Sequence, residues 1–160
     1  MNPITFVEEN QRVEIRFESP DILEFERDGY TVNHVIEAYV QGKEFGKTMA
    51  DKALTHVFSN NIEKTVGIEK EVVKHLKEQK FSPLASYLKV HSFYAFQVLI
   101  VVTEDNFNSD DFLKVYDYIH DVELKENSEL YNISFNFTNS SDYFNENHLK
   151  TDGYLVKIRS

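Results

Sequence analysis

The sequence predicts an α+β fold, with an antiparallel or mixed sheet and helices packed mainly on one face. Three features indicate this class: alternating apolar residues near the N-terminus, apolar residues at helical spacing in the middle, and a strand, helix, strand, strand order at the end. A chain of 160 residues without a linker-like stretch favours one domain over residues 1–160. We expect a β piece at about 1–28, a helical middle at about 31–90, and a C-terminal β-α-β-β unit at about 93–160.

The N-terminal β piece is predicted from alternation. In residues 11–18, apolar Val13, Ile15 and Phe17 alternate with charged residues, as is typical of a half-buried strand. Residues 4–7 are expected to pair with this strand as a hairpin. Residues 21–27 form a further, weaker strand candidate, closed by an Asp-Gly turn signal.

Apolar residues at spacings of three and four predict helices in the middle of the chain. One such pattern begins at Thr31, a plausible N-cap, and ends near Asn60–Asn61, as one kinked helix or two shorter ones. A second helix is expected over 62–80. Ser82–Pro83 is expected to end it and to open a short helix through Tyr87–Leu88.

The C-terminal part has the clearest pattern. Residues 93–103 are nearly all apolar, which predicts a central strand buried on both faces. Asn108 or Ser109 is expected to cap a following helix. Residues 130–138 and 153–159 alternate as strands. The apolar positions of the helix are Phe112, Val115, Tyr116, Ile119 and Val122.

A central strand that is apolar on both faces needs cover on its second face. The N-terminal hairpin, a helix or another subunit are the three alternatives. The third of them is our reason to consider a homodimer.

Composition excludes several classes of protein. The chain has no cysteine, which excludes disulfide frameworks, thiolate metal sites and cysteine nucleophiles. Its formal net charge of −10 argues against nucleic-acid binding, because phosphates require neutralisation by basic residues. No signal-like segment or long apolar run is visible, so we expect a cytoplasmic protein without membrane contact.

Catalytic motifs are scarce, and the sequence leans against an enzyme. Residues Gly42 to Thr48 resemble a P-loop only superficially, because the glycines are one residue too close together and follow a helical pattern. No motif of serine hydrolases, zincin proteases or dinucleotide-binding proteins occurs. We therefore expect no cofactor and no metal ion.

The acidic excess is concentrated in one segment. Residues 104–129 contain nine acidic residues and two lysines. Asp110, Asp117 and Asp121 fall on the helical face opposite the apolar one, and a one-sign patch of this kind steers a partner of opposite charge. Our first hypothesis is a non-enzymatic, regulatory or inhibitory domain that binds a basic protein surface through these residues. Plain solvation of an outer helix face is the simpler alternative.

The second hypothesis is a small-molecule-binding domain or an acid–base enzyme with a His/Asp/Glu site in an aromatic-lined pocket. Asp117, His120 and Asp121 are the densest candidate ligand or metal cluster, since they fall within little more than one helical turn. Tyr118, Tyr143 and Phe144 lie off the apolar patterns and are candidates to line such a pocket. This hypothesis requires the histidines and carboxylates to converge in space.

Overall fold

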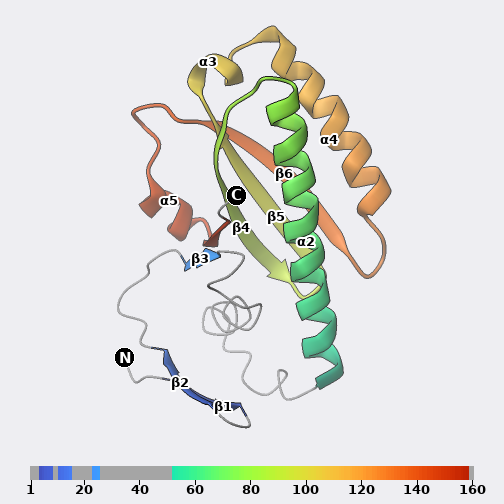
Figure 1. The fold of residues 1–160 in the computed structure, drawn as a ribbon, viewed down its shortest axis with the longest axis vertical. Helices are drawn as coiled ribbons and strands as arrows, with labels where there is room; N and C mark the ends of the chain where they lie inside the picture. The colour runs from blue at the N-terminus through green and yellow to red at the C-terminus, as the bar shows by residue number, and fades with distance from the viewer. Residues whose placement is uncertain (1–3, 9–10, 16–22, 26–51, 159–160) are drawn as a thin grey trace.

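The computed structural model describes residues 4–8, 11–15, 23–25 and 52–158, with side chains from residue 55 onward (Figure 1). The helix expected from Thr31 and the segment from Gly42 to Thr48 lie outside these residues. The described elements are β1 (Ile4–Glu8), β2 (Gln11–Ile15), β3 (Leu23–Phe25), α2 (Lys52–Glu78), β4 (Pro83–Ser92), β5 (Ala95–Val102), α3 (Glu104–Phe107), the 3-10 turn η2 (Asp110–Phe112), α4 (Leu113–Glu126), β6 (Asn132–Asn139), α5 (Glu146–Thr151) and β7 (Tyr154–Ile158).

Within the described part, five strands form one mixed sheet in the order β3-β7-β4-β5-β6. Strand β4 is antiparallel to β5 and β7, whereas β5 with β6 and β3 with β7 pair in parallel. Strands β1 and β2 form a separate antiparallel hairpin, as predicted. The α+β class is confirmed, and β5, α4, β6 and β7 are the predicted β-α-β-β unit.

Helices α2 and α4 lie side by side on one face of the sheet (Figure 1). The main core fills the space between them and the strands, with Phe58, Ile62 and Leu76 of α2 fully buried against the apolar side chains of β5 and β6. His75 of α2 stacks on Tyr118 of α4 with ring centroids 3.7 Å apart. In the described part of the chain, no helix is both long and apolar enough to cross a bilayer.

Helix α2 is continuous, so the predicted helix end near Asn60–Asn61 is wrong. The Asn61 side chain donates hydrogen bonds to the carbonyl oxygens of Phe93 and Leu130, at 3.0 and 3.3 Å. Asparagine commonly ends helices because it bonds its own backbone. Here that tendency is outweighed by bonds to distant residues.

Residues 83–92 form strand β4, so the predictions of a short helix through Tyr87–Leu88 and of a helical middle that reaches residue 90 are wrong. Tyr87 and Leu88 are both buried, on opposite faces of the sheet. A strand allows this because successive side chains point to opposite faces. Pairing with β5 and β7 on both sides outweighs the helix-start signal of Ser82–Pro83.

Strand β5 is buried on both faces, as the sequence predicts. Val98 and Ile100 face the core under α2 and α4, whereas Leu99 and Val101 belong to a second, smaller cluster on the opposite face. Leu149 of α5 completes that second cluster. Among the described residues, the helix that contributes to the cover of this face is α5.

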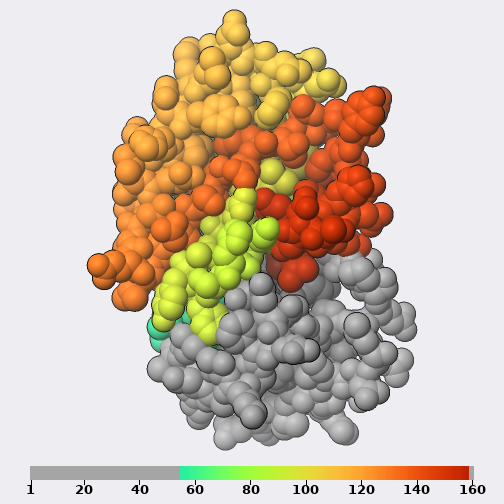
Figure 2. Space-filling view, turned by 180° about the vertical axis from the view of Figure 1, so that it is seen from behind, coloured from blue at the N-terminus to red at the C-terminus, as the bar shows by residue number. Residues whose placement is uncertain are grey.

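Helix α5 is tied to the sheet by polar contacts as well (Figure 2 shows this side, with the red surface of α5 beside the yellow-green surface of β4). Glu146 accepts a hydrogen bond from the Tyr87 hydroxyl at 2.6 Å and one from Lys157 Nζ at 3.1 Å. These two bonds lower the pKa of Glu146 below its ordinary value, so the carboxylate stays charged and the contact is kept at neutral pH.

Strand β6 is the edge of the sheet, because only β5 pairs with it in the described part. Asn132 and Ser140 donate their backbone N–H groups toward β5, at 2.6 and 2.9 Å. Backbone groups alternate in direction along a strand, so those of residues 133, 135 and 137 point away from β5. These are groups that an unprotected edge leaves open to another strand.

Side chains from α4 and its C-cap occupy part of this edge. Asn127 Oδ1 accepts a hydrogen bond from the Ile133 N–H at 2.7 Å, and Asn127 Nδ2 donates to the Ile133 carbonyl at 3.1 Å. Glu123 Oε1 accepts from the Phe135 N–H at 2.8 Å. The two side chains therefore take the place of a neighbouring strand and hold α4 in register with β6.

We expect Asn127→Ala to lower the free energy of unfolding by about 1–2 kcal/mol, because two hydrogen bonds to part-buried backbone groups are lost. Urea titration followed by circular dichroism measures the change. The control is Asn132→Ala, at an exposed position of the same strand, with an expected change below about 0.5 kcal/mol. Equal losses in the two variants would contradict the edge-protecting role of Asn127.

Candidate functional site

Helix α4 has an inner face packed on the sheet and an outer face that carries the predicted acidic residues. Val115 and Ile119 are buried on the inner face. Residues at spacings of three, four and seven lie on the same face of a helix. Here that face is the one opposite Val115 and Ile119. The exposed residues of this outer face include Lys114 and His120 as well as two leucines and two aspartates. We call the following five the acidic stripe, the first of which lies in η2 just before α4: Asp110, Leu113, Asp117, Asp121 and Leu124.

The leucines of the acidic stripe are mostly exposed, as are Leu84 and Leu130 elsewhere in the described part. Leu113 is 67% exposed and Leu124 is 68% exposed. They are eleven residues apart on the same face, about 16 Å along the helix axis. A single exposed leucine is common on protein surfaces. Two on one helix face, with Asp117 and Asp121 between them, give that face apolar ends and an acidic centre.

The acidic residues of this segment divide into two groups by their contacts. Glu126 lies 3.3 Å from Lys64 of α2, and Asp111 lies 2.9 Å from Lys114. Asp110, Asp117 and Asp121 make no ion pair with any residue that the structure describes. The acids at the predicted partner-binding positions are thus exposed without an ion pair to a described residue, as are Glu104, Asp105 and Glu129 of the same segment.

The start of α4 differs in detail from the predicted capping. Ser109 is the N-cap of η2, but its hydroxyl donates to the Asn106 carbonyl at 2.8 Å and makes no cap bond. Asn108 follows the end of α3. The side chain that caps a helix here is Thr103, which accepts from the Asn106 N–H at the start of α3. The acids of η2 lie in its first turn, where the helix dipole favours negative charge.

The structure does not assemble the candidate cluster of Asp117, His120 and Asp121 into a metal-binding group. Among the described residues, no three His, Asp or Glu side chains are arranged to hold a metal ion. The three residues share an exposed helix surface but do not converge on one point.

The second hypothesis requires histidines and carboxylates to meet, and the described histidines lie apart. His56 and His75 are at opposite ends of α2, His91 is in β4, His120 in α4 and His148 in α5. His56 contacts Asn60 at 3.3 Å, and His91 contacts Gln97 at 2.8 Å.

One histidine borders a small pocket of about 160 Å³ between the end of α2 and the start of α4. Tyr118 stacks on this histidine, and burial together with the charges of Glu71 and Glu78 raises the pKa of the tyrosine. The other candidate aromatics lie elsewhere, since Tyr143 is 92% exposed and Phe144 packs near Tyr87. The pocket residues are His75, Gln79, Phe81, Asp111, Lys114 and Val115.

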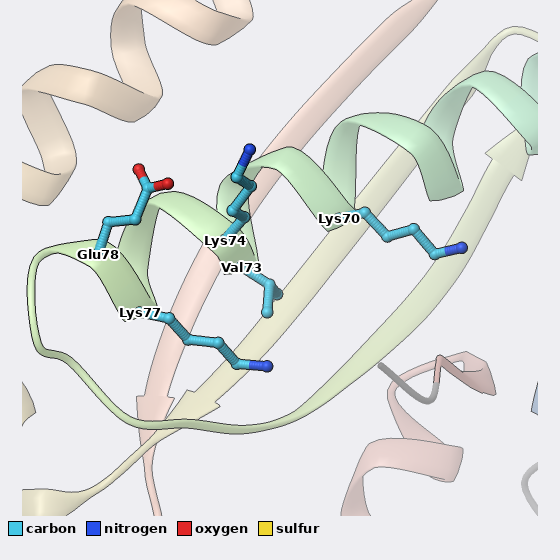
Figure 3. Close-up of a pocket in the computed structure, with 5 residues that line it drawn as sticks. All are labelled: Lys70, Val73, Lys74, Lys77 and Glu78. Carbon is cyan, nitrogen blue, oxygen red and sulfur yellow. The ribbon is translucent and has the colours of Figure 1, made fainter.

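A larger hollow of about 490 Å³ lies along the C-terminal half of α2. Figure 3 shows Lys70 and Lys77 pointing to the same side of the helix as Val73, whereas Lys74 and Glu78 point away from that side. Val73 is buried and forms the apolar base of the hollow. We call these five residues the lysine hollow. The lysine hollow was not predicted from the sequence, although lysines at spacings of four and seven indicate a shared helix face.

A carboxyl group is fully buried under α2. Glu69 Oε1 accepts a hydrogen bond from the Ser86 hydroxyl at 2.6 Å, and Glu69 Oε2 has no hydrogen-bond partner in the described part. Burial raises the pKa of Glu69 above its ordinary value, against smaller opposing effects of the Ser86 bond and of Lys70 and Lys77. The lysine hollow therefore lies beside a buried carboxyl group, and burial makes the charged form of this group unfavourable.

No protein-family model, curated protein or solved structure significantly matches this chain. The chemistry of the exposed surfaces is therefore the basis for assigning a function. Two surfaces stand out in the described part: the acidic stripe on α4 and the lysine hollow on α2.

We expect Glu69→Gln to stabilise the protein at pH 7. A raised pKa means that the folded protein holds this proton more tightly than the unfolded chain, so wild-type stability falls as pH rises above about 4.5. Glutamine stays neutral and keeps an oxygen for the Ser86 hydroxyl. Urea titrations across this pH range measure the difference between variant and wild type, which should grow with pH.

The control is Glu63→Gln on the exposed side of the same helix. A surface change of this kind should alter the free energy of unfolding by less than about 0.5 kcal/mol at either end of the range. A Glu69→Gln variant that is less stable than wild type at pH 7 would contradict the assigned cost of the buried charge.

Proposed function

We propose that this protein binds another protein through the acidic stripe on α4, and that its role is regulatory or inhibitory rather than catalytic. The observation that carries the proposal is the pair of exposed leucines on the same helix face as the unpaired Asp117 and Asp121. Solvation of a helix face requires charge but not leucine, so the leucines favour binding over solvation. We place this binding in the cytoplasm.

The two kinds of residue have different roles in the proposed binding. Burial of a leucine side chain contributes about 1.5–3 kcal/mol, so Leu113 and Leu124 supply most of the affinity. An exposed ion pair contributes only about 0.2–1 kcal/mol. The aspartates act mainly on the rate and the salt dependence of association, because a one-sign patch attracts a basic surface before contact. The expected partner presents apolar side chains within a basic surface.

The alternative of a His/Asp/Glu site for a small molecule has less support. It depends on convergence of titratable groups, and His75, a described histidine that borders a pocket, faces a space of about 160 Å³. Small-molecule pockets are commonly about 300–1,000 Å³. We therefore favour protein binding.

We expect Asp117→Lys/Asp121→Lys to reduce capture of partner proteins from native lysate and to abolish the decline of capture with salt. The reversed charges repel a basic surface. Immobilised wild-type and variant proteins are compared by quantitative mass spectrometry at several salt concentrations. Asp110 is left unchanged so that both altered residues lie within α4 itself.

The matched control is Glu63→Lys/Asp142→Lys, which changes the net charge equally at two exposed positions outside the stripe. It should leave capture close to that of wild type. Equal losses in both double variants would reduce the effect to net charge and contradict a role of the stripe.

We expect Leu113→Ser/Leu124→Ser to reduce capture at least about tenfold, the effect of about 1.4 kcal/mol, without loss of stability. Both side chains are mostly exposed, so thermal unfolding should be nearly unchanged. Leu84→Ser/Leu130→Ser is the control, since these leucines are 55% and 68% exposed but lie outside α4. Unchanged capture by the α4 variant would show that the leucines are not part of the binding surface.

A further inference from the structure

The acidic stripe and the lysine hollow repeat one pattern with opposite charge. In the hollow, Lys70 is followed by Val73 three residues on and by Lys77 seven residues on. In the stripe, Asp110 is followed by Leu113 and Asp117 at the same spacings. In α2 these spacings place a charge, an apolar side chain and a second charge along one side of the helix, spanning about 10 Å. In the stripe the first charge lies in η2 and the other two residues lie in α4.

We propose that the lysine hollow binds the acidic stripe of a second copy of this chain, with Leu113 of one copy lying over the hollow between Lys70 and Lys77 of the next. This inference rests on the proposed role of the stripe in binding protein and names the partner. Asp110 and Asp117 then lie opposite Lys70 and Lys77. The lysine hollow is open along a helix flank, a shape suited to another helix more than to an enclosed small molecule.

Charge complementarity supports this occupant. Lys70, Lys74 and Lys77 make no ion pair with any described residue, and the same holds for Asp110, Asp117 and Asp121. The hollow thus carries three lysines without an ion pair in the described part, beside one glutamate, Glu78, on a chain whose net charge is −10. The acidic surface needed to pair with them is present on the same chain, so every copy carries both halves of the contact.

The geometry determines the kind of assembly. The stripe lies on η2 and α4 and the hollow lies on the neighbouring helix α2, so the proposed contact joins two different surfaces of the chain (Figure 1 shows the two helices). Contact between different surfaces is heterologous, and copies add head to tail until a ring closes or a chain extends. The net negative charge of each copy opposes assembly at long range, which keeps it weak and dependent on concentration.

The test exchanges the charges of the two surfaces. One variant carries Lys70→Glu/Lys77→Glu and the other carries Asp110→Lys/Asp117→Lys. Sedimentation equilibrium is run at about 0.1 M salt, where long-range repulsion is screened beyond about 10 Å but contacting charges still interact. Wild type should show a mass above that of one chain, 18.8 kDa, that rises with concentration.

Each variant alone should remain at the mass of one chain, because its two surfaces carry the same sign. An equimolar mixture should associate again, because the acidic hollow of one variant matches the basic stripe of the other. Lys80→Glu/Lys125→Glu is the charge-matched control and should behave as wild type, since both lysines are exposed and outside the lysine hollow. Thermal unfolding checks that all variants fold.

New glutamates near the buried Glu69 can impair folding. In that case Lys70→Gln/Lys77→Gln takes the place of the first variant, and loss of association is the expected result. Wild type at the mass of one chain over the whole concentration range would overturn the inference. So would a mixture of two folded charge-exchange variants that does not associate.

Different results would overturn the binding role of the stripe and the identity of its partner. If the copies do not associate but Asp117→Lys/Asp121→Lys still reduces capture from lysate, the second copy is not the partner and the binding role of the stripe stands. If copies associate through these charges while lysate capture is unchanged, the stripe serves self-assembly rather than a foreign protein.

Discussion

Burial of strand β5 on both faces is the constraint on which the rest of the described structure depends. Its apolar run needs cover on two sides, which α2 and α4 supply on one and Leu149 of α5 supplies on the other. The inner faces of α2 and α4 are consumed by this packing. The acidic stripe lies on the outer face of η2 and α4, and the lysine hollow lies along the flank of α2 beside the buried Val73. The candidate binding surfaces are thus a consequence of how the core is closed.

The elements predicted correctly from the sequence are those whose signal is local. The inner face of α4 and the alternation of β6 each follow from one period of apolar residues. Strand β4 was missed because its identity depends on two distant neighbours, β5 and β7, which bury Tyr87 and Leu88 on opposite faces. The continuity of α2 through Asn61 likewise depends on carbonyl groups far along the chain.

In the candidate site, too, the features with a local signal in the sequence were predictable and those that depend on distant residues were not. Exposure of Asp110, Asp117 and Asp121 was predictable, because helical period and charge are visible in the sequence. The role of Glu123 in holding the edge of β6 was not predictable from the sequence. The residue is acidic like the others, and its partner is a backbone N–H group of a distant strand. The spacing of Lys70 and Lys77 was visible, but the hollow beside Val73 exists only once α2 is packed on the sheet.

The central claim is that the outer face of α4 is the surface at which this protein meets another protein. Site-specific photo-crosslinking from position 113, compared with position 130, tests this most directly, because both leucines are about equally exposed. The account predicts protein adducts, identified by mass spectrometry, from position 113 and few from position 130. Equal yields from the two positions, or none from position 113, would contradict it.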